Sequence, residues 1–321
     1  MEQKSVLIGM SGGVDSSVAA ALLKEQGYHV IGATMRLWTY SDSCNMKHEG
    51  CCAESAVEDA RRVCDKLGID FYVMNFKDMF KDKVVDYFVD EYIHGRTPNP
   101  CIACNKYLKF DALLKKALAM GIDYVATGHY ARIEKGADGK YILRASEAVK
   151  KDQSYVLYNF TQEQLAHTLM PLGGYNKDWV RQKAEELGLG VAHKPDSQEI
   201  CFVEDDDYAK FITDYSGYEP KEGDILDVNG NVIGKHRGLI YYTIGQRKGI
   251  GAYGRPMFVM KIDAENNTIT LGEKGMEFSN ELTAYDVNFV SGEFPKENML
   301  ITAKVRYQAP PAEAMLCPQK D

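Results

Sequence analysis

The stretch Ser11-Gly12-Gly13-Val14-Asp15-Ser16-Ser17 stands between an apolar run, Val6 to Met10, and a helical run that Gly27 closes. A strand, a glycine turn and a helix start in this order bring backbone N–H groups and the positive helix end to one point. Such a point binds phosphate. The Walker pattern is absent because no lysine follows Gly12 or Gly13, and G-x-G-x-x-G does not fit either. The alternative is a structural glycine turn with a Ser/Asp helix cap.

Length and charge narrow the class of protein. The chain has 321 residues and a mass of 36.0 kDa, enough for about two domains of ordinary size. The first residues run straight into an apolar segment without a separate leader, and no stretch approaches the roughly 18 apolar residues of a membrane span. We therefore expect a cytoplasmic protein without membrane attachment. The net charge of −8 means that any nucleic acid has to meet a local basic face.

The first half of the chain alternates apolar runs with amphipathic ones. The apolar runs have the length of buried strands, and the amphipathic runs have apolar residues at helical spacing. We expect strands at 6–10, 30–35, 71–74 and 124–127, helices at 18–26, 53–67 and 105–120, and an amphipathic helical stretch at 77–94. This order predicts an α/β domain with a doubly wound parallel sheet. Its nucleotide should lie at the carboxyl ends of the strands, where Gly9, Met35 and Gly128 fall.

The second half of the chain shows two different patterns of apolar residues. Residues 161–188 follow a helical pattern without strands, which predicts a small helical insert. Beyond Tyr218, short alternating runs are separated by the turn pairs Asn229-Gly230 and Asn266-Asn267, which favours a small β-barrel. We therefore divide the chain into a catalytic α/β domain at 1–160, a central helical domain at 161–217 and a C-terminal β-barrel at 218–321.

Three of the eight cysteines stand in contexts that suggest chemistry. In a chain of this size with a nucleotide loop, cysteines are typical of metal, redox or catalytic sites. Cys101 and Cys104 follow two prolines, and Cys104 lies near a helix start, where the dipole lowers the pKa of a thiol below about 8.5. The third, Cys201, follows the run Asp196 to Ile200. The C-x-x-C spacing also fits half of a zinc site, which three further cysteines could complete: Cys44, Cys51 and Cys52.

Seven segments together resemble one family. They are SGGVDSS (11–17), GCC (50–52), GRTPNPC with CNK (95–106), ATGHYAR (126–132), KKDQSY (150–155), DSQEICF (196–202) and YTIGQRKG (242–249). On these motifs the chain is identified as a member of the tRNA-specific 2-thiouridylase family, within the superfamily that cleaves ATP between the α and β phosphates. The resemblance implies ATP-dependent 2-thiolation of the wobble uridine, U34, of the tRNAs for lysine, glutamate and glutamine. It implies the same order of three domains.

The resemblance also assigns site residues. Cys201 would carry sulfur as a persulfide from a donor protein, a cysteine desulfurase or a sulfur-relay protein, and Cys104 would free that sulfur or close a disulfide with Cys201. ATP, with Mg²⁺ at Asp15, would bind Gly9, Met10, Ser11, Gly12, Gly13, Val14, Asp15, Ser16, Met35 and Gly128. The target base would meet Asn99, Pro100 and Cys101. The tRNA would contact His129, Lys151, Asp152, Gln153, Arg306 and Tyr307.

Two departures from the family pattern leave alternatives open. Many members have aspartate where this chain has Cys101, and thiols at Cys101, Cys104 and Cys201 could instead hold a [4Fe-4S] cluster with one open iron. The chain also ends at Asp321, before the last barrel strands that members usually have, so we expect a shortened barrel. Beside thiolation, an amidating ligase of the same superfamily and an inactive tRNA-binding or sulfur-relay module stay as alternatives. The sequence leaves the oligomeric state open.

Structural alternatives also apply to single residues at the expected tRNA face. His129 stands at a strand end and could be a core histidine, and Lys150 with Lys151 could form an ordinary solvated face. The wobble base has to leave its stack to reach an enclosed site. Contacts to the phosphates of a tRNA would draw on further basic residues. They are Lys106, Lys109, Arg132, Arg144, Lys235, Arg237, Arg247, Lys248, Lys304 and Arg306.

Overall fold

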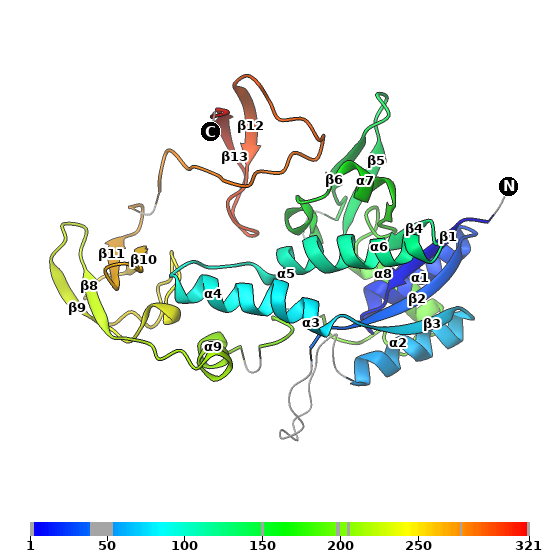
Figure 1. The fold of residues 1–321 in the computed structure, drawn as a ribbon, viewed down its shortest axis with the longest axis horizontal. Helices are drawn as coiled ribbons and strands as arrows, with labels where there is room; N and C mark the ends of the chain where they lie inside the picture. Colours follow the sequence, from blue (N-terminus) through cyan, green and yellow to red (C-terminus); the bar gives the residue numbers. More distant parts are fainter. Residues whose placement is uncertain are drawn as a thin grey trace.

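The computed structural model describes residues 3–38, 54–148, 151–196, 200–203, 206–276 and 278–319. Its centre is a five-stranded sheet with parallel pairs throughout, in the order β3-β2-β1-β4-β7 (Figure 1). The strands are β1 Ser5–Gly9, β2 His29–Arg36, β3 Asp70–Asn75, β4 Tyr124–Ala126 and β7 Thr168–Leu169. β1 lies in the middle, and its residues Val6, Leu7 and Ile8 are fully buried because helices cover both faces of the sheet.

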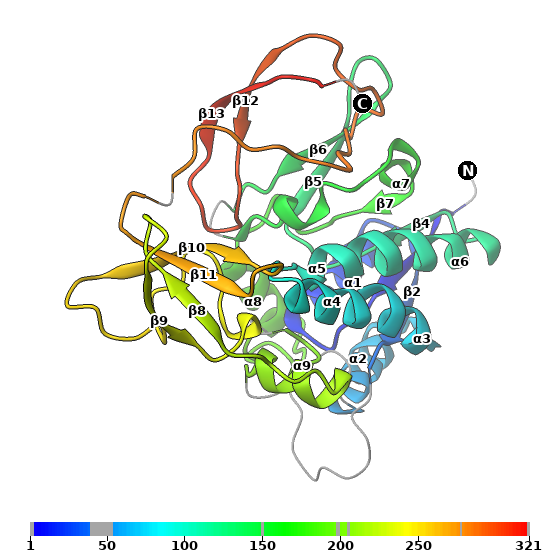
Figure 2. The same ribbon diagram turned by 60° about the vertical axis from the view of Figure 1, so that its left-hand side comes forward.

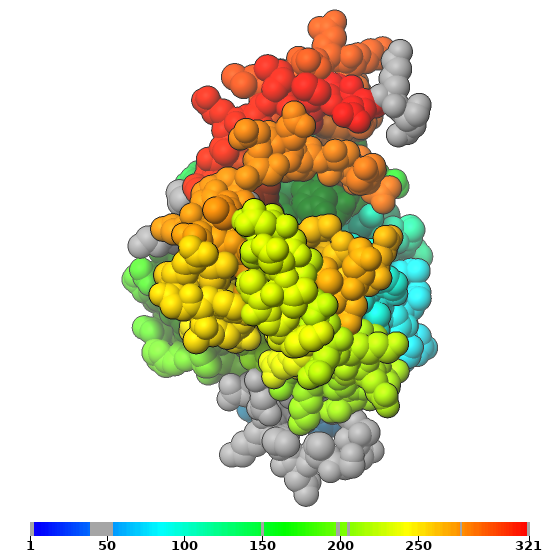
Figure 3. Space-filling view, turned by 90° about the vertical axis from the view of Figure 1, so that its left-hand side faces the viewer, coloured from blue at the N-terminus to red at the C-terminus, as the bar shows by residue number. Residues whose placement is uncertain are grey.

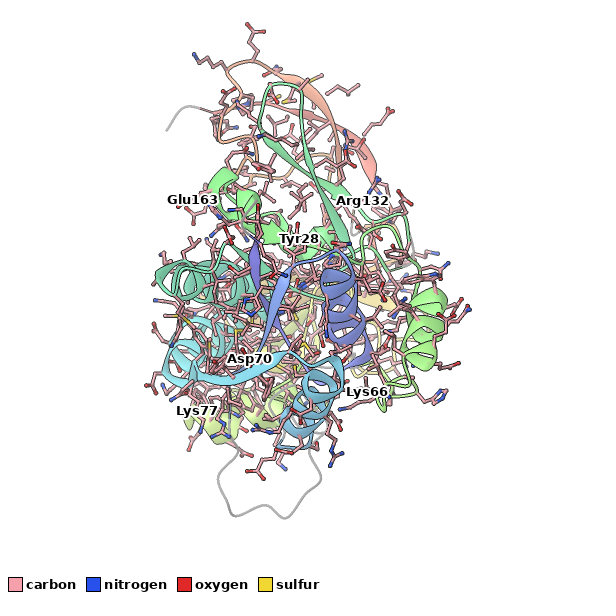
Figure 4. All side chains as sticks on the ribbon, turned by 90° about the vertical axis from the view of Figure 1, so that its right-hand side faces the viewer. Tyr28, Lys66, Asp70, Lys77, Arg132 and Glu163 are labelled. Carbon is pink, nitrogen blue, oxygen red and sulfur yellow. The ribbon has the colours of Figure 1, made fainter. Side chains whose placement is uncertain are left out.

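Helices pack on both faces of this sheet. One face carries α1 (Val14–Glu25), α2 (Glu54–Leu67) and α8 (Lys177–Glu186), which share a core with Val6 and Ile8. The other face carries two continuous helical stretches that pack on Leu7 and Ala33. They consist of α3 (Lys77–Phe80), the π-helical η1 (Lys81–Asp86) and α4 (Tyr87–Ile93), and of α5 (Pro100–Ala103), the π-helical η2 (Cys104–Ala112) and α6 (Leu113–Ala119). The expected doubly wound α/β fold is confirmed. Figure 4 labels Asp70, where the edge strand β3 begins, and Lys77, where α3 begins after that strand.

Two features of the middle of the chain differ from the sequence prediction. The prediction that 161–188 contains no strand was wrong, because β7 between α7 (Gln162–Ala166) and α8 pairs with β4. A strand of two residues is too short to show an alternating pattern. A hairpin of β5 (Ala131–Lys135) and β6 (Tyr141–Ala145) was also missed, although Asp138-Gly139 at its turn is a hairpin signal. The proposed domain boundaries at 160 and 217 stay predictions.

The C-terminal part is built from strands, as expected. After α9 (Tyr208–Ser216), a four-stranded sheet forms in the order β10-β11-β8-β9 around its own small core. Its strands are β8 Gly223–Leu226, β9 Val232–His236, β10 Met257–Asp263 and β11 Thr268–Glu273. A separate pair follows, β12 (Met299–Ala303) with β13 (Ala312–Leu316). The segment before β12 reaches the β5–β6 hairpin (Figure 2), where Lys140 Nζ lies 2.5 Å from a carboxylate oxygen of Glu293.

The C-terminal strands surround a recess. In the space-filling view of Figure 3, β12–β13 and the segment before them stand above the four-stranded sheet, and green residues of the middle of the chain are set back between the two. Arg306 and Tyr307 belong to the segment between β12 and β13. Over the ranges that the structure describes, no helix is both long enough and apolar enough to cross a membrane.

Candidate active site

The glycine stretch forms a loop at the carboxyl end of β1. Gly12 has φ of +69°, a left-handed conformation that favours glycine, and α1 begins two residues later at Val14. The hydroxyl of Ser17 donates to the carbonyl oxygen of Gly13 at 2.8 Å, and Ser16 donates to the same oxygen at 3.2 Å. These bonds fix the first turn of α1, and the N–H groups of a first helical turn point out of the helix start, as in sites that bind phosphate.

Close backbone packing fixes this loop against its neighbours. A Cβ atom at Gly128, just after β4, would lie 2.7 Å from the backbone nitrogen of Ser16 and 2.8 Å from the carbonyl carbon of Asp15. A Cβ atom at Gly12 would overlap the backbone of Ala56 in α2. Met35 lies on β2, two residues beyond the residue paired with Gly9. The structure thus brings the residues expected to bind ATP together at the carboxyl ends of the strands β1, β2 and β4.

Asp15, in the first turn of α1, contacts two partners that the sequence did not reveal. The hydroxyl of Tyr130 donates to Oδ1 of Asp15 at 2.7 Å, and Nζ of Lys177 lies 2.8 Å from both carboxylate oxygens. Burial, and next the charge of Asp15, raise the pKa of Tyr130, so the phenol stays a hydrogen-bond donor. Both partners come from distant parts of the chain, and although Tyr130 lies in the motif 126–132, nothing in the sequence pairs either of them with Asp15.

A second carboxylate, that of Asp196, forms ion pairs with several cations beside the loop. Asp196 is bound by Lys177 at 2.7 Å, Lys151 at 2.8 Å and Arg181 at 3.2 Å. Burial acts to raise the pKa of Asp196, but the hydrogen bonds and charges of Lys151 and Lys177 outweigh it and lower the pKa below its ordinary value. Nζ of Lys194 donates to the carbonyl oxygen of Gly12 at 3.1 Å. The phosphate loop is therefore bordered by positive charge.

The structure brings Cys104 and Cys201 to one hydrophobic core. Cys104 is only 8 % exposed within that core, and Cys201 is half-buried and packs against it. Phe202, next to Cys201, is buried among aromatic rings, with centroids 5.2 Å from Phe88 and 5.6 Å from Phe80. This aromatic contact fixes the backbone of Cys201 beside the helices of the α/β domain.

Cys101 has a different environment. Its side chain is exposed, and its backbone N–H donates to Oδ1 of Asn99 at 3.1 Å. Asn99 is therefore the N-cap of α5, with Pro100 as the first helical residue. In the described ranges, no group of three or more histidine, cysteine, aspartate or glutamate side chains could hold a metal ion. Cys101, Cys104 and Cys201 accordingly do not form a cluster site here. The proposed zinc ligands Cys44, Cys51 and Cys52 lie outside the described residues.

Most of the expected tRNA-contacting residues near β4 make internal contacts. Nδ1 of His129 lies 2.7 Å from Oγ1 of Thr127, and burial, with the charge of Lys109, holds the pKa of His129 well below its ordinary value. Oδ1 of Asp152 accepts the N–H of Ser146 at 2.9 Å. Oε1 of Gln153 accepts the N–H of Tyr130 at 2.9 Å. Lys151 pairs with Asp196, and Lys150 lies outside the described residues.

Arg306 and Tyr307 join the C-terminal part to the α/β domain. Arg306 donates to the carbonyl oxygen of Ile244, in the segment 242–249, at 2.8 Å. The rings of Tyr307 and Tyr155 meet edge to face with centroids 6.0 Å apart, and Tyr155 donates to the carbonyl oxygen of Val305 at 3.3 Å. The motifs at 150–155 and 242–249 therefore both contact the segment between β12 and β13. The residues of this junction are far from the phosphate loop in the sequence.

Comparison with known proteins agrees with this architecture. The model of the tRNA methyl transferase HUP domain matches residues 4–205, and that of the tRNA methyl transferase PRC-barrel domain matches residues 209–273. The chain is 58 % identical to the tRNA-specific 2-thiouridylase MnmA of Acetivibrio thermocellus, over 100 % of this chain and 90 % of the relative. It is equally identical to the enzyme of that name from Clostridioides difficile, over 98 % and 87 %. The chain belongs to the tRNA-specific 2-thiouridylase family. The expected C-terminal barrel domain is thereby confirmed.

Solved structures resemble the chain more weakly. A 4-thiouridine synthetase in complex with RNA and bound ATP matches 60 % of this chain and 43 % of its own, at 18 % identity and a TM-score of 0.38. A TM-score this low supports no inference about the chain. Membership of the 2-thiouridylase family rests on the sequence relatives and the family models.

Proposed function

We propose that the chain catalyses ATP-dependent 2-thiolation of U34 in tRNA, with the tRNAs for lysine, glutamate and glutamine as substrates. The observation that carries the proposal is the combination of a phosphate loop at Ser11–Ser17 with two thiols, Cys104 and Cys201, that share one hydrophobic core. The high identity to relatives named 2-thiouridylase supports it. A ligase of the same superfamily would use the loop but has no use for the two thiols.

The first proposed step activates the base. The C2 carbonyl oxygen of the uridine attacks the α-phosphorus of ATP, the bond from that phosphorus to the β-phosphate oxygen breaks, and pyrophosphate leaves. The base then carries AMP as a leaving group. Cleavage of ATP between the α and β phosphates suits a loop that lacks the Walker lysine, because that lysine accompanies γ-phosphate transfer. Close packing of Gly12 on Ala56 and of Gly128 on the start of α1 fixes the backbone of this loop.

The second proposed step transfers sulfur. A persulfide on Cys201, supplied by a donor protein, brings the sulfur. The Cys104 thiolate attacks Sγ of Cys201, which forms a disulfide and releases hydrosulfide, and the hydrosulfide adds to C2 and displaces AMP. Two electrons from a thiol reductant return the disulfide to two thiols. The burial of Cys104 would shield this exchange from water.

Mg²⁺ and the iron–sulfur alternative fit the residues differently. The Asp15 carboxylate is a hard oxygen donor beside the loop, as Mg²⁺ requires, and would hold the ion near the phosphates to neutralise their charge. For the cluster, the described residues offer no group of three metal-ligating side chains. We therefore route no step through a cluster.

The tRNA would bind across the recess of Figure 3. The chain carries 46 acidic against 38 basic residues, so the polyanion needs local basic groups. Arg237 lies over the ring of Tyr241, 3.9 Å from its centroid, and Lys304 lies 5.3 Å from the centroid of Tyr307. Such pairs of cations and aromatic rings suit phosphates and unstacked bases. We propose that Arg306, Tyr307, His129 and the segment 151–153 contribute to this surface.

The products of one incubation test the function. Protein, ATP, tRNA and sulfide, or a persulfide donor, should give AMP, pyrophosphate and a uridine in which sulfur replaces oxygen, measured by nucleoside mass spectrometry. ADP as the nucleotide product would overturn the proposal. A methylated nucleoside would favour the activity in the family model's name, and absence of turnover with tRNA still bound would favour the inactive module.

A further inference from the structure

Lys177 occupies a position that helix stability does not explain. It is the first residue of α8, where the positive end of the helix dipole disfavours a cation. Asn176 caps the helix by accepting the N–H of Trp179 at 2.8 Å, and the rings of Tyr175 and Trp179 stack with centroids 3.9 Å apart. These contacts fix the helix start. The Lys177 side chain is only 12 % exposed and forms ion pairs with two carboxylates, those of Asp15 and Asp196.

The side chain of Lys177 reaches the phosphate loop at Asp15. We propose that Lys177 supplies the phosphate-binding cation that the SGGVDSS loop itself lacks, and that it stabilises the pyrophosphate leaving group of adenylation. The inference rests on the proposed function. Nζ of Lys177 lies 2.8 Å from both oxygens of Asp15, in the first turn of α1. A lysine on a four-carbon stem held at this turn reaches the space in front of the loop amides.

The neighbouring cations are committed to other contacts. Lys194 binds Asp59 at 2.9 Å and the carbonyl oxygen of Gly12. Arg181 donates to the carbonyl oxygen of Ala192 at 2.8 Å as well as to Asp196. Lys151 contacts Asp196 and is 41 % exposed. Lys177 differs because it contacts Asp15 directly, while Asp196 anchors it from the other side at 2.7 Å.

The proposed role needs no proton transfer. As the uridine oxygen bonds to the α-phosphorus, the bond to the β-phosphate oxygen breaks and the electron pair stays on pyrophosphate. Lys177 remains protonated throughout and donates hydrogen bonds to the oxygen that gains charge. Donors placed where charge develops are worth more in the transition state than in the ground state. Asp196 keeps the ammonium in place while its bond to Asp15 is exchanged for one to phosphate.

The test compares Lys177→Gln with a control on the same helix. Lys183 also lies on α8 and pairs with Glu25 at 2.9 Å, away from the loop, so Lys183→Gln removes one charge without touching Asp15. Binding of inorganic pyrophosphate is measured by calorimetry, and tRNA-dependent AMP release by steady-state kinetics. Lys177→Gln should weaken pyrophosphate binding about tenfold or more and lower kcat about 100-fold. Lys183→Gln should leave both unchanged, and Lys177→Arg should restore most of the pyrophosphate affinity.

Lys177→Gln leaves the carboxylates of Asp15 and Asp196 without the lysine between them, and this repulsion could prevent folding. A second comparison covers that case. Asp196→Asn removes this repulsion, so Asp196→Asn is compared with the double variant Asp196→Asn/Lys177→Gln. The double variant should bind pyrophosphate about tenfold more weakly. The inference would be overturned if Lys177→Gln bound pyrophosphate as tightly as the unmodified protein and the double variant bound it as tightly as Asp196→Asn. The proposed function would still stand in that case if the unmodified protein released AMP. ADP release by the unmodified protein would instead reject the proposed function itself.

Discussion

The hydroxyl of Tyr130 donates a hydrogen bond of 2.7 Å to Oδ1 of Asp15. Tyr130 follows β4 and is 2 % exposed, whereas Asp15 opens α1. The bond therefore ties the phosphate loop to the end of the sheet. Burial of Tyr130, followed by the negative charge of Asp15, raises the pKa of the phenol, so the hydroxyl keeps its proton across the range of working pH.

Tyr130→Phe removes this hydroxyl and little else. A hydrogen bond to a charged group contributes about 1.5–3 kcal/mol, so the free energy of unfolding should fall by about that amount and ATP should bind more weakly. Urea unfolding and ATP titration measure both quantities. Tyr72→Phe is the control, because Tyr72 is 50 % exposed and its change should stay within about 0.5 kcal/mol. Equal stability of the two variants would contradict the structural role of the bond.

Gly128→Ala should displace the phosphate loop. The added methyl group would lie 2.7 Å from the backbone nitrogen of Ser16, so either the start of α1 or the end of β4 has to move. We expect a loss of about 1–3 kcal/mol in unfolding free energy, as for other overpacked sites, together with weaker ATP binding. Gly174→Ala is a matched control, because a Cβ atom there would have open space. If Gly128→Ala binds ATP normally, the loop does not depend on this close approach.

The buried thiol of Cys64 should resist modification. Burial, together with the charge of Asp65, raises the pKa of Cys64 to about 12, so almost no thiolate exists at pH 8. Cys317 is exposed and provides the comparison within the same chain. A brief exposure to iodoacetamide at pH 8, followed by peptide mapping, should label Cys317 and leave Cys64 unlabelled until urea is added. Labelling of both at one rate in the folded protein would be inconsistent with the packing.

Asp123 should make the fold sensitive to acid. Hydrogen bonds from Lys4 and from the backbone and side chain of Ser5 lower the pKa of Asp123 to about 2. Because the folded-state pKa lies below the unfolded value, the contribution to stability is present above about pH 4. It is lost as the pH falls from about 4 to 2. Urea unfolding should therefore show Asp123→Asn less stable than the unmodified protein at pH 6, with the gap closing towards pH 2. A gap that is the same at both pH values would contradict this.

The elements with a strong repeating pattern could be predicted from the sequence. Helix α2 was expected at 53–67 and spans Glu54–Leu67, and β2 was expected at 30–35 and spans His29–Arg36. Both bury one clear face or a continuous apolar run, so the pattern reflects the packing directly. The placement of the loop at the sheet edge followed from the same rules. The family motifs agreed with this arrangement, and the relatives and family models confirmed the family.

The charged network around the loop could not be predicted. Lys177 and Asp15 are 162 positions apart, and an amphipathic helix with a lysine in its first turn looks like any solvated helix. Tyr130 stands within the motif 126–132 but received no role there, and the capping role of Asn99 was hidden by its expected contact with the base. Such pairings depend on tertiary contacts, which a local pattern does not encode. The roles of individual site residues beyond these contacts stay predictions.

The yield of 2-thiouridine from cysteine variants tests the central claim most directly. Cys104→Ser and Cys201→Ser should each abolish thiolation while ATP and tRNA still bind, because a serine hydroxyl cannot carry or exchange a persulfide. Cys317→Ser is the control, since Cys317 is exposed and lies in the C-terminal segment. Cys101→Ser should keep its activity under the two-thiol mechanism and lose iron and activity under the cluster alternative. Thiouridine is measured without oxygen in all four variants. Loss with Cys104→Ser and Cys201→Ser alone is the predicted result, and full thiouridine yield from either of these two would contradict the account.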